Sequence, residues 1–303
     1  MAEIPLSRLV SIRDAKEVWP VVADTVHGIS PLVDLAPVRA VYNDVLRLFA
    51  GQYPGYRACN TVYHDLRHTT DTLLAMARLL HGATAAGERV TDRAIQLGLI
   101  AALLHDTGYI QESDDTEGTG AKYTDMHVER SIRFAGAYLD ARGFPEADRA
   151  FCRHVILCTE LIEEDEVPEP PSAEADLLGK MLATADLLGQ MATRTYLEKL
   201  LFLFYEFQEG RVGRYKSEFD LLEQTLDFCQ YATERLESRL GGVHRFMREH
   251  FRARWGLEED PYAEGMAHQA AYLRNIIENH PDDYRRHLKR EGLIEKLNDL
   301  YRK

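Results

Sequence analysis

The stretch from Leu97 to Tyr109 (LGLIAALLHDTGY) constrains the fold more than any other part of the chain. Up to Leu104 it is apolar on every side, which is typical of a helix buried in the middle of a helical bundle. It then carries His105 and Asp106 to the end of that buried helix. Because an ionised carboxylate is costly to bury without a partner, Asp106 indicates a cation in the interior, and the adjacent imidazole suits a transition metal or hydrated magnesium. The alternative is a helix that reaches solvent at His105, and this pair alone leaves both interpretations open.

Two other segments bring the same residue types. In Asn60–Asp71 (NTVYHDLRHTTD), a helix would place His64 and His68 four residues apart, with both imidazoles on one face. Leu177–Met191 (LLGKMLATADLLGQM) is a second strongly apolar segment. It contains a single acidic residue, Asp186, near its centre. The simplest arrangement that satisfies these polar groups is one metal ion shared by four side chains, namely His68, His105, Asp106 and Asp186.

The order H…HD…D is similar to that of the HD-domain metal-dependent phosphohydrolases. The run Tyr63–His68 (YHDLRH) resembles more particularly the first signature of the cyclic-nucleotide phosphodiesterases, Tyr-His-Asn-x-x-His, with Asp65 at the position of the asparagine. Asp71 falls where that family often has an aspartate. Looser matches extend the resemblance to about Tyr231, at residues 121–125 (AKYTD), 155–161 (VILCTEL) and 205–210 (YEFQEG).

The resemblance implies an all-α bundle, and we expect one domain over residues 56–240 with helical extensions over residues 1–55 and 241–303. It also implies one or two divalent metal ions. With imidazole and carboxylate ligands and no thiolate, manganese, magnesium, zinc and iron all remain open. If two ions bind, Asp106 is the natural bridge between them.

On this interpretation the chain hydrolyses a phosphoester, most directly a 3′,5′-cyclic nucleotide such as cAMP or cGMP, which it opens to the 5′-monophosphate. Metal-bound hydroxide, generated beside Asp106, would attack phosphorus. His64, one helical turn from the ligand His68, would protonate the leaving oxygen as general acid. The alternatives are a nucleotide phosphohydrolase of the same superfamily, an HD-type di-iron oxygenase, and a degenerate HD module that acts by binding.

Further residues are candidates by type or by position. In the resembled family a glutamine hydrogen-bonds the purine and a phenylalanine stacks on it, which makes Gln224 and Phe228 candidates for substrate binding together with Tyr63, while Gln230 competes with Gln224. Some HD proteins add two histidines between the HD pair and the last aspartate. His127 and His154 are therefore candidates for a second metal ion or its water shell, and each is equally compatible with a plain surface or core histidine. Glu160, at the position of a family aspartate, and Asp71 are further candidates for the same role.

Charge and cysteine usage limit the partners. A net charge of −13 with no clustered Lys and Arg argues against nucleic acid, so we expect a small-molecule phosphoester as the ligand. The four cysteines form no CxxC pair, no signal peptide is evident, and no apolar run reaches the roughly 18 residues of a membrane span. These features predict a cytoplasmic protein that does not enter a membrane. The basic segment 244–254 (HRFMREHFRAR) is expected to form a solvated helix face or a homodimer contact.

Overall fold

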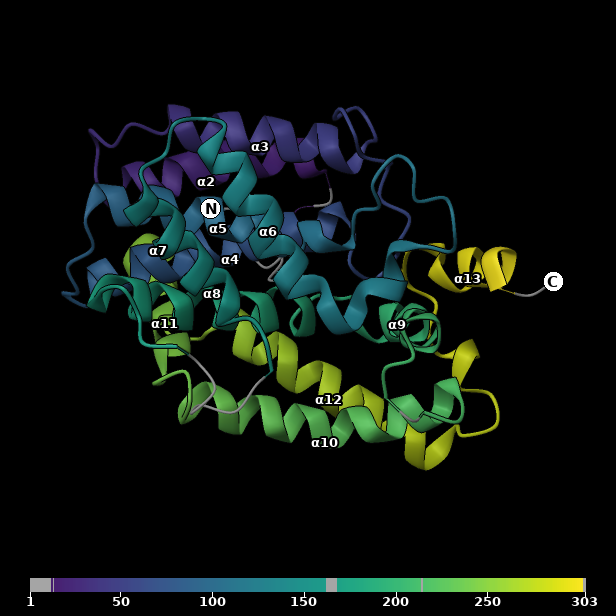
Figure 1. Ribbon diagram of the computed structural model, residues 1–303. Helices are drawn as coiled ribbons and strands as arrows, with labels where there is room; N and C mark the ends of the chain where they lie inside the picture. Colours follow the sequence, from purple (N-terminus) through teal and green to yellow (C-terminus); the bar gives the residue numbers. More distant parts are fainter. Residues whose placement is uncertain (1–11, 13, 162–167, 214, 302–303) are drawn as a thin grey trace.

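A computed structural model describes residues 12, 14–161, 168–213 and 215–301 (Figure 1). Within these ranges the chain forms helices and connecting turns, and apart from one isolated bridge between Tyr56 and Glu112 it contains no β-structure. The prediction of an all-α fold is confirmed. The helices are α2 (Ala15–His27), α3 (Ala36–Phe49), α4 (Leu66–Ala85), α5 (Asp92–Leu104), α6 (His127–Asp140), α7 (Glu146–Leu157), α8 (Ala173–Met191), α9 (Tyr196–Gly210), α10 (Glu218–Glu237), α11 (Phe246–Trp255), α12 (Pro261–Asn279) and α13 (Leu293–Tyr301).

Helix α5 is the buried helix that the sequence predicts. Every residue from Ala94 to Leu104 is buried, and the Thr91 side chain caps the helix by accepting a hydrogen bond from the Ala94 amide. Burial of each leucine or isoleucine side chain contributes about 1.5–3 kcal/mol, so this helix supplies a large part of the core. Its C-terminal end therefore delivers His105 and Asp106 to the interior rather than to solvent.

Helix α4 begins later than the sequence suggests. The Asp65 carboxylate accepts a hydrogen bond from the His68 amide at 2.9 Å and acts as the N-cap, so the helix starts at Leu66. The prediction of one helix carrying both His64 and His68 is therefore wrong, because His64 precedes the cap. The two imidazoles are nevertheless neighbours, with ring centroids 6.0 Å apart.

A glycine lets α8 approach α4 closely. A Cβ atom on Gly189 would lie 3.2 Å from the backbone nitrogen of Thr72, tighter than most contacts of real Cβ atoms. The N-terminus of α8 is capped by Ser172, whose hydroxyl accepts a hydrogen bond from the Ala175 amide. This packing of α8 on α4 brings Asp186 to the side of His68.

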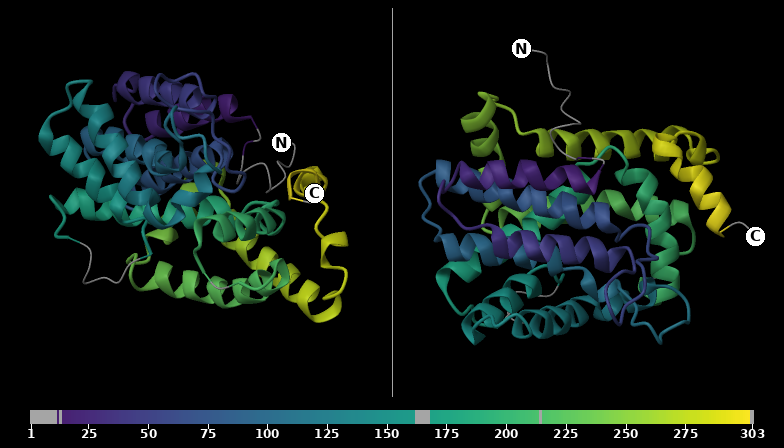
Figure 2. Two further views of the ribbon diagram at one scale, coloured as in Figure 1. Left: turned by 45° about the vertical axis from the view of Figure 1, so that its right-hand side comes forward. Right: turned by 90° about the horizontal axis from the view of Figure 1, so that it is seen from above.

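The hydrophobic residues form two packed clusters. One joins α2 and α3 to α4, α5, α6, α7, α8 and α11, and the other lies among α9, α10, α12 and α13. Figures 1 and 2 show α10, α12 and the turns after α12 as a layer along one side of the bundle. The predicted extensions over residues 1–55 and 241–303 thus share these clusters with the central helices, and the predicted domain boundaries stay a prediction.

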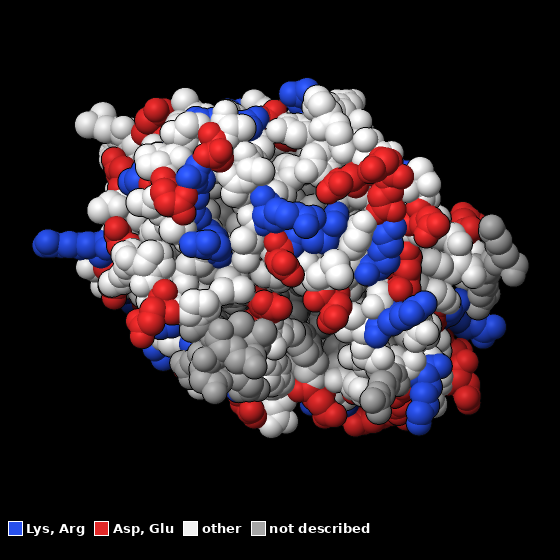
Figure 3. Space-filling view, in the orientation of Figure 1, with Lys and Arg blue, Asp and Glu red and all other residues white. Residues whose placement is uncertain are grey.

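The surface and the helix lengths add two observations. On the face seen in Figure 3, Lys and Arg side chains lie beside Asp and Glu side chains. None of the described helices combines the length and the apolar character that crossing a membrane requires.

Candidate metal centre

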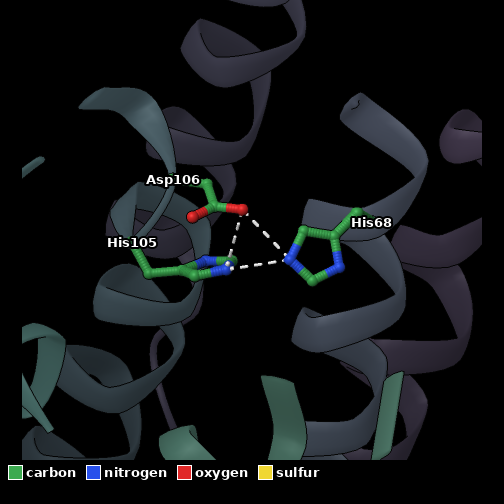
Figure 4. A group of neighbouring side chains, drawn as sticks. All are labelled: His68, His105 and Asp106. Carbon is green, nitrogen blue, oxygen red and sulfur yellow. Dashed lines mark hydrogen bonds and ion pairs between the residues drawn. The ribbon is translucent and has the colours of Figure 1, made fainter. Parts of the chain in front are cut away.

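Three side chains from two segments meet inside the bundle (Figure 4). His68 comes from α4, His105 caps the end of α5, and Asp106 follows it directly. The Nε2 atoms of the two histidines lie 3.3 Å apart, and the Oδ2 atom of Asp106 lies 3.0 Å from Nε2 of His68 and 3.4 Å from Nε2 of His105. All three residues are buried.

Asp186 completes the group from α8. Its Oδ1 atom lies 3.1 Å from Nε2 of His68 and 3.7 Å from Nε2 of His105. The same oxygen accepts a hydrogen bond from Nε2 of Gln190 at 2.9 Å, and the Gln190 side chain in turn accepts one from the Tyr63 hydroxyl. The structure therefore brings together the four side chains that the sequence singles out.

The imidazoles present ring nitrogens to the centre of this group. Nδ1 of His105 lies 2.9 Å from the carbonyl oxygen of Ala102, and a proton on Nδ1 donated to that carbonyl leaves the lone pair of Nε2 facing the cluster. His68 also directs Nε2 inward, while its Nδ1 is buried without a hydrogen-bond partner among the described residues. The orientation of the His68 ring is thus not fixed through Nδ1 by any described residue.

The imidazoles and carboxylates of the cluster shift one another's pKa values. Burial by itself lowers the pKa of His68, but Asp106 and Asp186 outweigh it and raise that pKa to about 9. The pKa of His105 rises well above its ordinary value for the same reason. Burial raises the pKa of a carboxyl group, yet the two imidazoles hold the pKa values of Asp106 and Asp186 below their usual range. In the metal-free protein the histidines therefore keep protons that a metal ion would displace.

The spacing of these four groups fits a metal ion. Bonds of about 2.0–2.2 Å at tetrahedral or octahedral angles separate neighbouring ligand atoms by about 3–3.6 Å. The measured nitrogen–nitrogen and nitrogen–oxygen distances span 3.0 to 3.7 Å. Moreover, the buried Oδ2 atom of Asp106 accepts no hydrogen bond from a described residue although two ring nitrogens lie near it. Such an arrangement suits groups that surround a common ion.

A second polar group, built on His64 and Glu206, stands beside the cluster. Nδ1 of His64 lies 2.8 Å from Oε2 of Glu206, which is only 2 % exposed. Oε1 of Glu206 accepts hydrogen bonds from the backbone amides of Val62 and Tyr63 at 2.8 and 2.7 Å. Glu206 thereby fixes the ring of His64 with Nδ1 as the donor and leaves Nε2 directed away from it.

Tyr109 supports His64 from the other side. Its ring lies nearly parallel to the His64 ring, at 12° and a centroid distance of 4.1 Å, and its hydroxyl oxygen lies 3.4 Å from Nε2 of His64. Burial and the nearby carboxylates raise the pKa of Tyr109 well above its ordinary value, so the hydroxyl stays protonated. Two glycines fix this segment: a Cβ on Gly108 would lie 2.0 Å from the carbonyl oxygen of His127, and one on Gly120 would lie 1.9 Å from that of Tyr109.

A cavity of about 550 Å³ opens next to these groups. Asp186, His64 and Tyr109 line one part of it, and α8, α9 and α10 supply most of the remaining wall. The three residues expected to bind substrate all line it, namely Tyr63, Gln224 and Phe228. The Gln224 amide donates a hydrogen bond to Oδ1 of Asp220 at 2.8 Å. The apolar wall consists largely of Leu187, Met191, Leu200, Leu203, Phe207 and Leu221.

Of the residues proposed for a second metal ion, His127 lies nearest the cluster. Its Nε2 atom is 3.9 Å from Oδ1 of Asp106, the carboxylate oxygen that faces away from His68. Nδ1 of His127 lies 2.6 Å from the carbonyl oxygen of Thr124, and burial lowers the pKa of the ring, so a neutral imidazole directs its lone pair toward Asp106. This geometry is compatible with a bridging Asp106.

The other three expected residues lie elsewhere. His154 lines a separate surface pocket, where its Nε2 atom is 3.7 Å from Sγ of Cys158, and the structure does not bring it to the cluster. Its ring extends from α7 toward Gly179 of α8. The residue type of His154 suits a metal ligand but does not predict this direction. Glu160 lines both this pocket and the main cavity. Asp71 is buried beside Arg67, whose Nε atom lies 3.8 Å from its Oδ2 atom.

Sequence reasoning missed Glu206 as a functional residue. It lies within YEFQEG, a segment that matches the resembled family, but no local pattern connects it to a histidine 142 positions earlier in the chain. Tyr109 and Gln190 were missed for a different reason: both lie at the end of an apolar segment, where an aromatic or amide side chain is ordinarily a packing residue.

The comparisons with known proteins identify the family. A model of the Npun_R2479-like family matches residues 41–234, and the chain belongs to that family. The matched range contains the four cluster residues, His64 and Glu206. Neither the curated proteins nor the solved structures gave a significant match.

Proposed function

We propose that this protein is a metal-dependent phosphohydrolase whose substrate is a phosphodiester, most directly a 3′,5′-cyclic nucleotide. One observation carries the proposal: the Nε2 atoms of His68 and His105 lie 3.0 to 3.7 Å from carboxylate oxygens of Asp106 and Asp186, at the edge of a large cavity. The resemblance of their order to the HD-domain phosphohydrolases supports the same conclusion.

A divalent ion held by these residues would lower the pKa of a water molecule and neutralise charge on the phosphate oxygens. The chain itself supplies the proton for the leaving oxygen. His64 lines the cavity, and its hydrogen bond from Nδ1 to Glu206 leaves Nε2 directed away from that carboxylate and available to the leaving oxygen. Because two backbone amides hold Glu206, this proton donor is preorganised before substrate enters.

The charge of the cavity wall favours a substrate with one negative charge on phosphorus. Among the described residues that line the cavity, Arg235 is the one lysine or arginine. Its guanidinium donates hydrogen bonds to the carbonyl oxygens of Cys158 and Glu160, at 3.3 and 2.9 Å, so it is engaged with the backbone. A triphosphate needs several cations to offset its charge, whereas a cyclic phosphodiester needs few. The apolar wall suits a base and ribose, with Gln224 and Phe228 as candidates to contact the base.

Product analysis by phosphorus NMR tests this proposal. The metal-loaded protein would be incubated with cyclic AMP, cyclic GMP, nucleoside mono- and triphosphates and a generic diester. We expect the 5′-monophosphate from a cyclic nucleotide, no turnover by Asp106→Ala, and a large rate loss in His64→Ala. The exposed His268→Ala on α12 serves as the matched control and should keep full activity.

Two results would redirect the assignment. Release of inorganic phosphate or triphosphate would preserve the hydrolase but make it a nucleotide phosphohydrolase. Absence of turnover by fully metallated protein with every substrate would contradict the proposal, and oxygen consumption by an iron-loaded sample would then favour the oxygenase alternative.

A further inference from the structure

The turn that follows α12 gathers a second set of metal-binding residue types, remote in sequence from the candidate metal centre. His280 caps the end of α12, Asp283 lies in the turn, and His287 caps the short helix η5 (Tyr284–Arg286). One ligand atom from each of the three lies within 4.8 Å of the others. Figure 1 shows this turn beyond the end of α12, beside the start of α10.

The three side chains surround a common point without bonding well to one another. Nδ1 of His280 lies 3.7 Å from Oδ1 of Asp283, and Nε2 of His287 lies 3.5 Å from the same oxygen. Both distances exceed the usual 2.7–3.2 Å of an N–H···O hydrogen bond. The two imidazole rings are stacked, with centroids 3.7 Å apart and an angle of 24°. Small rotations that open the stack would aim both nitrogens at one ion next to the carboxylate.

From this arrangement we infer that His280, Asp283 and His287 form a second metal site, which binds a first-row divalent transition ion such as Zn²⁺. Two imidazoles and one carboxylate are a ligand set that these ions accept, and water would fill the remaining positions. Ca²⁺ and Mg²⁺ prefer oxygen ligands and fit this set poorly. The inference does not depend on the proposed phosphohydrolase function.

An ion at this turn would stabilise one wall of the main cavity. Tyr284 and Arg285 lie between the proposed ligands in the chain, and both bind Glu218, the first residue of α10: the Tyr284 hydroxyl donates at 2.8 Å and Nε of Arg285 at 2.7 Å to its Oε2 atom. Glu218 is buried, and five α10 residues farther along the helix line the cavity, namely Leu221, Gln224, Thr225, Phe228 and Arg235.

The turn also forms a hydrogen bond with α12. The Tyr272 hydroxyl donates a hydrogen bond to the carbonyl oxygen of His287 at 2.8 Å. An ion that fixes His280 to His287 would therefore close a continuous connection from α12 through η5 to the N-terminus of α10. We expect Zn²⁺ bound here to slow local opening of α10.

The test is Zn²⁺ binding by the full-length protein, measured by equilibrium dialysis against a buffered series of free Zn²⁺ with elemental analysis. We compare wild type with His280→Ala, Asp283→Asn, His105→Ala and the control His268→Ala, a histidine exposed on the same helix α12. The first two variants should each lose one Zn²⁺ equivalent, or bind it at least about tenfold more weakly, because even outer partners of metal ligands contribute that much. His105→Ala should keep that equivalent, and His268→Ala should match wild type.

Hydrogen exchange supplies a second readout that does not need metal counting. In wild type, Zn²⁺ should increase the protection of amides in residues 218–228, and this increase should be absent in His280→Ala. Equal Zn²⁺ affinity and stoichiometry in wild type, His280→Ala and Asp283→Asn would overturn the site. Zn²⁺ binding at the turn without added protection in α10 would overturn its connection to the cavity wall.

Discussion

Replacing Glu206 by glutamine tests the role of His64 as a proton donor. The two backbone amides of Val62 and Tyr63 require an oxygen at the Oε1 position, so the glutamine must place its NH₂ group opposite Nδ1 of His64. That NH₂ can only donate, so Nδ1 must accept, and the ring loses the hydrogen bond that Nδ1 donates to Glu206 in wild type. General acid catalysis is worth about 10²–10⁴-fold, so we expect kcat to fall by that factor, equivalent to about 3–5 kcal/mol of barrier, with little change in KM.

The assay compares two substrates of the proposed hydrolase. With a cyclic nucleotide, whose leaving alkoxide needs a proton, Glu206→Gln and His64→Ala should both be slow. With a 4-nitrophenyl phosphodiester, whose leaving group needs no proton at neutral pH, both variants should approach wild type. The control is Glu209→Gln on the same helix, since Glu209 is exposed and its carboxylate accepts hydrogen bonds from the amide and the hydroxyl of Thr119 rather than from His64. Equal losses on both substrates would refute proton donation by His64 and indicate a structural role.

Three further predictions follow from other parts of the structure. Tyr109→Phe keeps the ring against His64 and should retain most activity, whereas Tyr109→Leu removes that ring contact and should lose substantially more; equal kcat values for the two variants would contradict the positioning role. Burial, with Arg78 and other cations nearby, lowers the pKa of His250 to about 2, so this ring stays neutral in the folded protein. Because the unfolded chain binds a proton at this ring below about pH 6.5, the free energy of unfolding should fall by up to about 1.4 kcal/mol per pH unit below that pH. Denaturant unfolding at pH 7 and pH 5 should therefore show less pH dependence in His250→Phe, and an unchanged dependence would refute this origin. Removal of metal by a chelator should lower Tm more in wild type than in Asp106→Ala, since an ion present at 100 times its Kd stabilises the native state by about 2.7 kcal/mol. Equal Tm shifts in the two proteins would contradict binding at Asp106.

The buried part of the candidate site could be predicted because burial restricts what a charge can do. The apolar sequences around Asp106 and Asp186 place one carboxylate in the interior and the other at the cavity wall beside it, where a shared partner is the simplest way to satisfy both. That reasoning needs only the helical periodicity of each segment. The same reasoning fails at His64. Asp65 could continue the helix or cap its N-terminus, and a capping hydrogen bond worth about 1 kcal/mol decides between the two.

Long-range contacts account for what the sequence left out. Glu206 matters because α9 packs so that its carboxylate reaches the amides of Val62 and Tyr63, and nothing near Glu206 in the sequence encodes that register. His154 shows the converse. Its residue type suits a metal ligand, but the rotation of α7 about its axis directs the ring toward Cys158 and away from Asp106.

The central claim is that four side chains share one metal ion, and anomalous diffraction from crystals of the Mn²⁺-loaded protein tests it most directly. Our account predicts an anomalous peak about 2.0–2.3 Å from Nε2 of His68, Nε2 of His105, Oδ2 of Asp106 and Oδ1 of Asp186. Absence of a peak at this position in crystals soaked to saturation, with these atoms bonded only to one another, would contradict it.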